Sequence, residues 1–140
     1  KSFGSPIPCG ILVARKQNVS RIARSIAYIG SLDTTITGSR NGVTPLFLWY
    51  MIKKLGLEGL KKRVETSLEM AEYTEKRLRE AGVDAWRNPN AITIVFPEVK
   101  EAVREKWQLA TADGKTHLIC MPNVRKNQID QFIGDLKKMI

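Results

Sequence analysis

The polar segment over residues 31–42 holds the side chains with the clearest capacity for chemistry. Arg40 and Asn41 could bind a carboxylate or a phosphate, because the guanidinium group of arginine offers a planar pair of donors. Ser39, beside Gly38, could donate to a phosphate through its hydroxyl or its backbone N–H. Arg40 could equally tie the loop to a helix end or to a partner subunit, and Ser39 could be an ordinary turn residue. A polar loop is costly to order, so this composition suits a binding site.

Two residues that precede this loop could take part in the same chemistry. Tyr28 leads into the loop and could donate a proton or form a wall of the site, although a tyrosine beside Ile26 is also typical of a core. Ser5 follows a glycine and could donate to a phosphate, or simply complete a turn. The sequence alone leaves these alternatives open.

Metal and disulfide chemistry have little support. His117 is the single histidine and lies in an apolar stretch, so we expect a hydrogen-bonded core histidine and no metal site. Cys9 and Cys120 are flanked by apolar residues or proline, which favours two buried thiols. Two cysteines are too few for a zinc cage and fit a reducing, cytoplasmic setting.

The composition is that of a folded protein and narrows the range of partners. Hydrophobic residues make up 43% and charged residues 26% of the 140, which excludes a disordered chain. No apolar run approaches the roughly 20 residues of a membrane span, so we expect no membrane partner. The net charge of +9 suggests nucleic-acid binding as a function, but the basic residues are dispersed and no nucleic-acid motif accompanies them. The chain lacks an initiator Met, which is consistent with a fragment.

The first part of the chain is expected to be the edge of something larger. Residues 11–14 form an apolar run typical of a strand buried on both faces. A helix is predicted over 18–29 and stops at Gly30. Thr44 and Pro45 open a second helix, which is apolar almost all round to residue 55 and therefore expected to be buried.

The second part predicts a small α/β unit. Residues 60–81 show a 3.6-residue apolar period with Glu75 and Arg79 at i,i+4, and Gly82 follows as a helix stop. Strands are predicted over 91–97 and 115–121. The intervening helix covers 99–110 and a terminal helix covers 127–139, with Gly56 and Gly59 separating this unit from the first part. The predicted fold class is α/β.

Several stretches together resemble the group II pyridoxal-phosphate-dependent amino-acid decarboxylases, in their histidine decarboxylase and serine decarboxylase branch. They include the Lys-Ser-Phe-Gly-Ser-Pro start, the Gly-Ser-Arg-Asn-Gly loop over 38–42, the Phe-Leu-Trp-Tyr stretch over 47–50 and the Met-Pro-Asn-Val stretch over 121–124. The similarity covers essentially all 140 residues.

The resemblance implies the C-terminal part of a fold-type-I enzyme. Residues 1–56 would end the large cofactor-binding domain, and residues 57–140 would form the small C-terminal α/β domain. Lys1 would bind pyridoxal 5'-phosphate through its amine and act in catalysis, together with Tyr28. Ser5 and Ser39 would help to bind the cofactor, while Arg40 and Asn41 would bind the amino-acid substrate. The family also implies a homodimer with its site at the subunit interface.

The resemblance favours histidine as the substrate and keeps serine as the alternative. The strand region over 88–97 is nearer the bacterial histidine branch, whereas residues 121–124 are nearer the plant serine branch. Val43 stands where the family usually has His, and Ala91 stands where close relatives tend to have a small hydroxyl residue. A catalytically silent relative that acts as an interaction module is therefore a further hypothesis.

Overall fold

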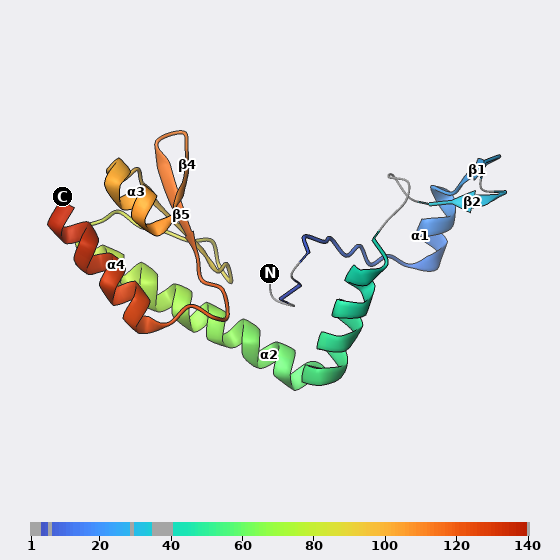
Figure 1. Cartoon of the computed structure of the whole chain (residues 1–140), viewed down its shortest axis with the longest axis horizontal. Coiled ribbons are helices and arrows are strands. Elements are labelled where there is room, and N and C mark those ends of the chain that lie inside the picture. The colour runs from blue at the N-terminus through green and yellow to red at the C-terminus, as the bar shows by residue number, and fades with distance from the viewer. Residues whose placement is uncertain (1–3, 6, 29, 35–40, 140) are drawn as a thin grey trace. The chain divides into compact units, whose positions relative to one another are not determined.

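The computed structural model describes residues 4–5, 7–28, 30–34 and 41–139. The chain divides into two compact units, with the boundary between Lys54 and Leu55. The elements, labelled in Figure 1, are α1 (Lys16–Arg21), β1 (Arg24–Ile26), β2 (Ser31–Asp33), α2 (Val43–Glu80), β3 (Thr93–Pro97), α3 (Glu101–Trp107), β4 (Ala110–Ala112), β5 (Lys115–Ile119) and α4 (Lys126–Met139).

The first unit contains a short helix followed by a two-stranded hairpin. α1 ends at Arg21, and β1 then pairs antiparallel with β2, which places Arg24 opposite Asp33. Gly30 has a φ of 63° and donates its N–H to the carbonyl of Ile26 at 3.1 Å. The prediction of a helix over 18–29 is therefore wrong beyond residue 21. A glycine with positive φ lets the chain reverse, and β-branched isoleucine fits the strand that results.

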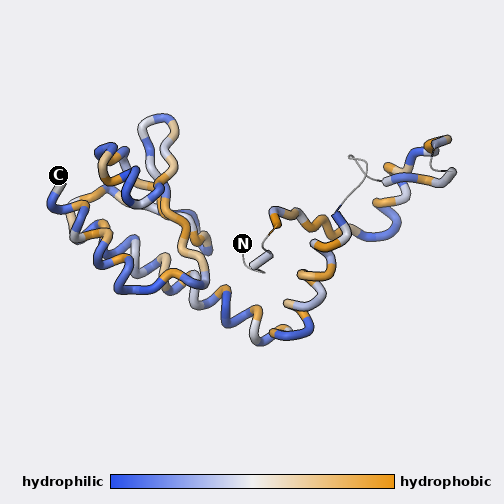
Figure 2. Tube along the Cα trace, viewed as in Figure 1, coloured by the Kyte–Doolittle hydropathy of each residue, from blue (hydrophilic) through white to orange (hydrophobic). Residues whose placement is uncertain are grey.

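The apolar segment over residues 11–14 forms no strand, so that prediction is also wrong. Leu12 and Val13 are 90% and 87% exposed. A strand needs a neighbour to satisfy its backbone N–H and C=O groups, and no strand among the described residues pairs with this segment. Cys9, two residues before this segment, is exposed, contrary to expectation, whereas Cys120 is buried as expected. Figure 2 shows this stretch as one of the more hydrophobic parts of the chain.

α2 consists of two helices joined at a kink. Gly56 has a φ of 61° and a ψ of −170°, which confirms the expected break there. Gly59 is helical, so the prediction of a second break there is wrong. A Cβ at Gly59 would lie 2.9 Å from the Cβ of Leu55, and this close approach requires glycine. The helix before the kink was expected to be buried, and this prediction is wrong because its own unit offers few packing partners. Its exposed apolar side chains include Leu46, Trp49, Tyr50 and Ile52.

The second unit contains a three-stranded antiparallel sheet in the order β3–β5–β4. β3 and β5 pair from Thr93 opposite Ile119 to Pro97 opposite Lys115. The strands expected over 91–97 and 115–121 are confirmed in slightly shorter form. The helix expected over 99–110 is confirmed over the shorter range of α3, and the terminal helix begins one residue earlier than expected, at Lys126. β4 is an addition: its three residues pair with β5 and were not predicted from the sequence.

Helices α2, α3 and α4 pack on one face of this sheet. In β3, Ile94 and Phe96 are buried while their neighbours are half-buried or exposed, which is the alternation of a strand with one covered face. The ring of Phe132 lies 6.2 Å from that of Phe96 and 5.5 Å from that of Trp107. The core comprises Met70, Ala71, Leu78, Ala85, Ile94, Phe96, Val103, Cys120, Ile129, Phe132, Ile133 and Leu136.

The end of α2 is closed by a glycine in the left-handed region. Gly82, the expected stop, has a φ of 81°. Its N–H donates to the carbonyl of Arg79 at 2.9 Å, and the N–H of Val83 donates to the carbonyl of Leu78 at 3.0 Å. These two bonds are those of a Schellman motif, which satisfies carbonyls that the helix end leaves open. Over the described residues, the helices do not combine the length and apolar character of a membrane span.

Candidate functional site

Three of the six residues predicted for the site, Lys1, Ser39 and Arg40, lie outside the described residues. The structure therefore places only Ser5, Tyr28 and Asn41. The roles of all six stay predictions.

Ser5 and Asn41 both make local hydrogen bonds. The hydroxyl of Ser5 donates to the carbonyl of Ile7 at 2.7 Å, which is a turn contact. The Oδ1 atom of Asn41 accepts the N–H of Val43 at 2.8 Å, at the first residue of α2. This bond between residues two apart is an Asx turn that leads into α2, whereas Thr44, the expected cap, already lies inside the helix. The amide nitrogen of Asn41 is not involved in this bond.

Tyr28 lies in the turn between β1 and β2 and is 96% exposed. The alternative of a core tyrosine is therefore wrong for this structure. A proton donor needs a reacting group within hydrogen-bond reach, and no described residue contacts the phenol oxygen. Ser5 and Asn41 make only local hydrogen bonds and Tyr28 is exposed, so no reaction step follows from the described geometry.

His117 lies at the centre of β5, half-buried between the edge strands. It pairs with Val95 on one side and Ala110 on the other. The structure gives its imidazole no hydrogen bond among the described residues, so the prediction of a hydrogen-bonded core histidine is wrong. Within the same residues, no three His, Cys, Asp or Glu side chains gather as metal ligands would.

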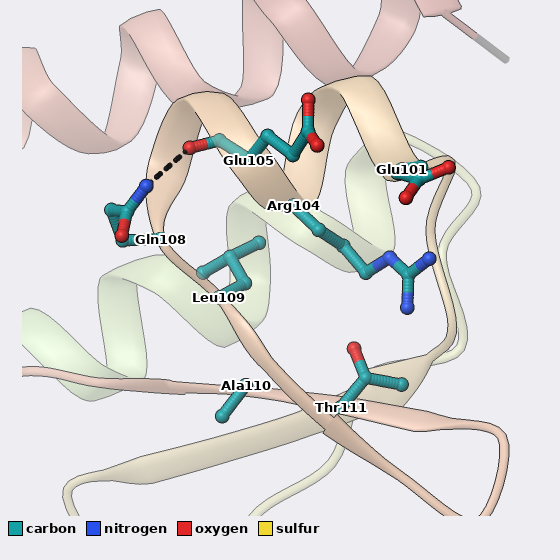
Figure 3. A pocket seen from close by; sticks show the side chains of 7 residues that line it. All are labelled: Glu101, Arg104, Glu105, Gln108, Leu109, Ala110 and Thr111. Carbon is teal, nitrogen blue, oxygen red and sulfur yellow. Dashed lines mark hydrogen bonds between the residues drawn. The ribbon is translucent and has the colours of Figure 1, made fainter.

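A polar cavity of about 480 Å³ lies between α3 and β4 and is shown in Figure 3. Arg104 extends into it, and its Nη1 atom lies 2.6 Å from the Oε1 atom of Glu98. The buried Nε atom of Arg104 has no hydrogen-bond partner among the described residues. The dashed contact in the figure joins the Nε2 atom of Gln108 to the carbonyl of Glu105 at 2.7 Å. Because Glu98 already balances the guanidinium charge, this cavity is no strong anion site.

The groups with shifted pKa values tie helices together. Tyr73 donates to the Oδ1 atom of Asp130 at 2.6 Å, and the Nε atom of Arg77 lies 3.1 Å from the same oxygen. The Tyr73 hydroxyl lowers the pKa of the Asp130 carboxyl, and this hydrogen bond raises the pKa of Tyr73 in turn. Burial raises the pKa of the Cys120 thiol. These contacts join α2 to α4 and the sheet and indicate a structural role.

Glu75 is a second link, which sequence reasoning found only in part. The expected i,i+4 pair of Glu75 and Arg79 is confirmed at 2.7 Å. Glu75 also binds Arg87 at 2.8 Å, and Arg87 continues to the carbonyl of Ala91 at 3.3 Å. The i,i+4 spacing gave the first contact, but no local pattern gives a contact twelve residues away.

The chain is similar over nearly its whole length to several decarboxylases. It is 47% identical over 133 residues to histidine decarboxylase of Mesorhizobium japonicum and 50% identical over 137 residues to histidine decarboxylase of Morganella morganii. These alignments cover 95% and 97% of this chain and 36% of each relative. Serine decarboxylase 3 of Oryza sativa subsp. japonica is 45% identical over 141 residues, and this alignment covers 99% of this chain and 31% of the relative. The chain thus spans about a third of the length of these relatives. No protein-family model matches it.

Solved structures show the same likeness. L-methionine decarboxylase from Streptomyces sp. 590, in its internal aldimine form, matches with a TM-score of 0.67 at 30% identity. That match covers 82% of this chain and 26% of the solved one. Sphingosine-1-phosphate lyase of Burkholderia pseudomallei shares the fold, with a TM-score of 0.68 at 17% identity over 89% and 31% of the two chains. These matches confirm the expected α/β class, as a C-terminal part of the fold-type-I enzymes.

Proposed function

Because this chain belongs to the histidine and serine decarboxylase branch of the group II pyridoxal-phosphate-dependent decarboxylases, we propose that it completes an enzyme that converts histidine to histamine. The observation that carries the proposal is 47–50% identity to two bacterial histidine decarboxylases over nearly the whole chain. The full-length enzyme would be a carboxy-lyase, and this chain would contribute the end of its large domain over residues 1–56 and its small domain over residues 57–140.

Lys1 carries the central role in this proposal. Its amine would hold pyridoxal 5'-phosphate, whose ring supplies the electron sink that decarboxylation requires. Ser5 and Ser39 would bind the phosphate, although the Ser5 hydroxyl must first leave its 2.7 Å bond to the carbonyl of Ile7. Tyr28 would hold the proton that the substrate carbon receives, and its exposed phenol is free to take up such a contact.

Arg40 and Asn41 would bind and orient the amino-acid substrate. The Asn41 oxygen is used at the start of α2, so its amide nitrogen is the atom left to donate to a substrate carboxylate. Arg40 would add a planar pair of donors to the same carboxylate. Because the helix start fixes the position of Asn41, the substrate contact would be held by the same bond that begins α2.

Serine decarboxylation is the second candidate, supported by 45% identity to a rice serine decarboxylase. Val43 bears on the choice between histidine and serine as the substrate. The family pattern has His at this position, and valine offers no polar group to a substrate. The Val43 side chain is 48% exposed, so it is not committed to packing among the described residues. Loss of the polar group also supports a third candidate, a silent relative that acts as an interaction module.

The proposed enzyme would be a cytoplasmic homodimer with its site at the subunit interface. Free thiols at Cys9 and Cys120 fit a reducing compartment. The exposed apolar helix before the α2 kink, with Trp49 and Tyr50, supports burial in a larger assembly. Sedimentation of the full-length protein would measure the oligomeric state directly.

CO₂ release by the full-length protein tests the proposal, with pyridoxal phosphate added and histidine or serine offered separately. We expect release from histidine, its loss in Lys1→Ala, and its retention in the control Lys16→Ala, which removes an exposed lysine of α1. Release from serine alone would move the assignment to the second candidate. Cofactor binding without release from either would favour another amino acid or a silent relative, and failure to bind cofactor would refute the proposal.

A further inference from the structure

The peptide bond between Asn41 and Gly42 differs from the bonds that follow the other asparagines of the chain. Those other asparagines are Asn18, Asn88, Asn90, Asn123 and Asn127. Asn41 is the one that glycine follows, and both residues of the pair are exposed. A Cβ built at Gly42 would meet no atom of the described residues within 4 Å. The absent side chain and this open space leave the Gly42 backbone nitrogen without steric shielding.

Hydrogen bonding also distinguishes the Asn41–Gly42 pair. The N–H of Gly42 donates to no acceptor among the described residues. After the other asparagines the following N–H is either bonded or missing: Val19 donates to the carbonyl of Arg15 at 3.2 Å, Ala91 to that of Asn88 at 3.1 Å, Val124 to that of Met121 at 2.9 Å and Gln128 to that of Arg125 at 3.1 Å, while Pro89 has no N–H. The Gly42 nitrogen can therefore lose its proton and attack a carbonyl without first breaking a hydrogen bond.

The Asn41 side chain is held close to this nitrogen. Its Oδ1 atom accepts the N–H of Val43 at 2.8 Å, which folds the side chain over the Gly42 peptide. The same N–H would stabilise the negative charge that Oδ1 acquires when the side-chain carbonyl carbon, Cγ, is attacked, as the donors of an oxyanion hole do. Because the nucleophile and the carbonyl belong to adjacent residues, no second molecule has to be brought into position.

We propose that Asn41 is a site of spontaneous deamidation in the full-length protein. The Gly42 nitrogen forms a bond to Cγ and gives up its proton, while the bond between Cγ and the side-chain nitrogen breaks and ammonia leaves with that proton. The product is a five-membered succinimide. Water then opens this ring: addition at Cγ leaves aspartate, and addition at the backbone carbonyl carbon of residue 41 leaves isoaspartate. Both products carry a new negative charge, and no atom is oxidised or reduced.

The consequence for catalysis rests on the proposed function, in which Asn41 binds the substrate carboxylate. A carboxylate at residue 41 would repel the substrate carboxylate and would remove the amide donor. Aspartate keeps an oxygen for the Val43 N–H, and a negative charge is favourable at the start of α2, so the fold should survive the change. Deamidation would thus weaken substrate binding as the protein ages without unfolding it.

Peptide mapping by mass spectrometry tests the proposal on the full-length protein, sampled over time at neutral pH. Asn123 serves as the internal reference, because it is also exposed but is followed by Val124, whose N–H is bonded. We expect Asn41 to deamidate at least on the order of tenfold faster than Asn123, since a hydrogen bond that must first break slows attack by about that factor. Equal rates at the two asparagines, or no change at Asn41, would overturn the proposal.

A matched pair of glycine variants tests the route through the succinimide. Gly42→Ala adds a methyl group beside the attacking nitrogen where there is room for it, whereas Gly10→Ala makes the same change after a cysteine. Gly42→Ala should slow the deamidation of Asn41 and Gly10→Ala should not. Isoaspartate, detected through an isoaspartyl methyltransferase, should appear together with aspartate, because both come from one ring. Aspartate without isoaspartate would indicate direct hydrolysis by water and would overturn the route.

Kinetics of the Asn41→Asp variant separate this inference from the proposed function. With histidine, Asn41→Asp should raise KM more than the neutral variant Asn41→Ser, whose short hydroxyl can still accept the Val43 N–H. If Asn41 deamidates but the two variants share one KM, the link to the substrate site is refuted. If Asn41 stays intact while CO₂ is released, the inference fails and the function stands. Deamidation of Asn41 in a protein that releases no CO₂ would support the modification and count against the function.

Discussion

Two glycine-to-alanine substitutions should change the stability of the second unit in opposite directions. Gly82 ends α2 with a φ of 81°, whereas Gly134 lies within α4, and a Cβ at either position would meet no atom within 4 Å. An added methyl group therefore meets no steric obstacle at either position, and the backbone conformation alone determines whether the substitution raises or lowers stability. This makes Gly134→Ala a matched control for Gly82→Ala.

The magnitude follows from known conformational costs. An L-residue in the left-handed region costs about 1–2 kcal/mol, and the smaller entropy of unfolded alanine returns about 0.4–1 kcal/mol. Gly82→Ala should thus lower the free energy of unfolding by about 1 kcal/mol. Gly134→Ala should raise it by up to about 1 kcal/mol, the difference in helix propensity between the two residues. The two variants should differ by roughly 2 kcal/mol.

Urea unfolding followed by circular dichroism measures both changes in the 140-residue chain. Equal slopes against urea concentration would show that the midpoints report stability. Shifts of the same sign in the two variants would refute the reasoning, because strain at Gly82 would then not be the deciding term. An unchanged midpoint for Gly82→Ala would show that the helix end relaxes out of the Schellman motif at no cost.

Three further predictions concern the second unit and the two cysteines of the chain. Phe132→Ala should lower the unfolding free energy by about 3–5 kcal/mol in the urea assay, since the side chain is completely buried; a loss below about 1 kcal/mol would contradict the packing described. The Tyr73 hydroxyl is the main cause of the lowered pKa of Asp130. The stability that the Asp130 carboxylate contributes is therefore present above the pKa of an unfolded carboxyl group, about 3.9, and is lost as pH falls through the lower pKa of the folded state. The stability advantage of wild type over Asp130→Asn should accordingly shrink on acidification below that value, and a constant advantage across urea titrations at several pH values would argue against this. Cys9 should react with a thiol reagent in the native chain, whereas Cys120 should react only on unfolding; simultaneous reaction would contradict their exposure.

The second unit could be read from local sequence patterns. The three-and-four spacing of Ile129, Phe132 and Leu136 predicts α4, and the β-branched run before Pro97 predicts β3, because each pattern reports burial against one neighbouring layer. β4 escaped prediction since Ala110–Ala112 has little strand propensity of its own. Its strand character comes from pairing with β5 across a tight turn.

The same local patterns did not predict the first unit correctly. Apolar spacing over 18–29 fits a helix, but nothing in that spacing distinguishes Ile26 in a helix from Ile26 in a hairpin that reverses at Gly30. The residue types of the polar loop indicated a binding site, and the resemblance added Lys1 and the specific roles. Lys1, Ser39 and Arg40 lie outside the described residues, and catalytic geometry depends on contacts distant in sequence, which no local period encodes.

The contribution of α4 to the core has a consequence for the order of events during synthesis. Ile129, Phe132, Ile133 and Leu136 complete a core whose other members begin at Met70. A ribosome therefore produces α2 and all three strands of the sheet before the helix that closes their apolar face exists. Until α4 is made, only α2 and α3 can cover Phe96 and Ile94, and the apolar surface left exposed is the kind that chaperones bind. Folding of this unit is thus completed only after α4 has been synthesised.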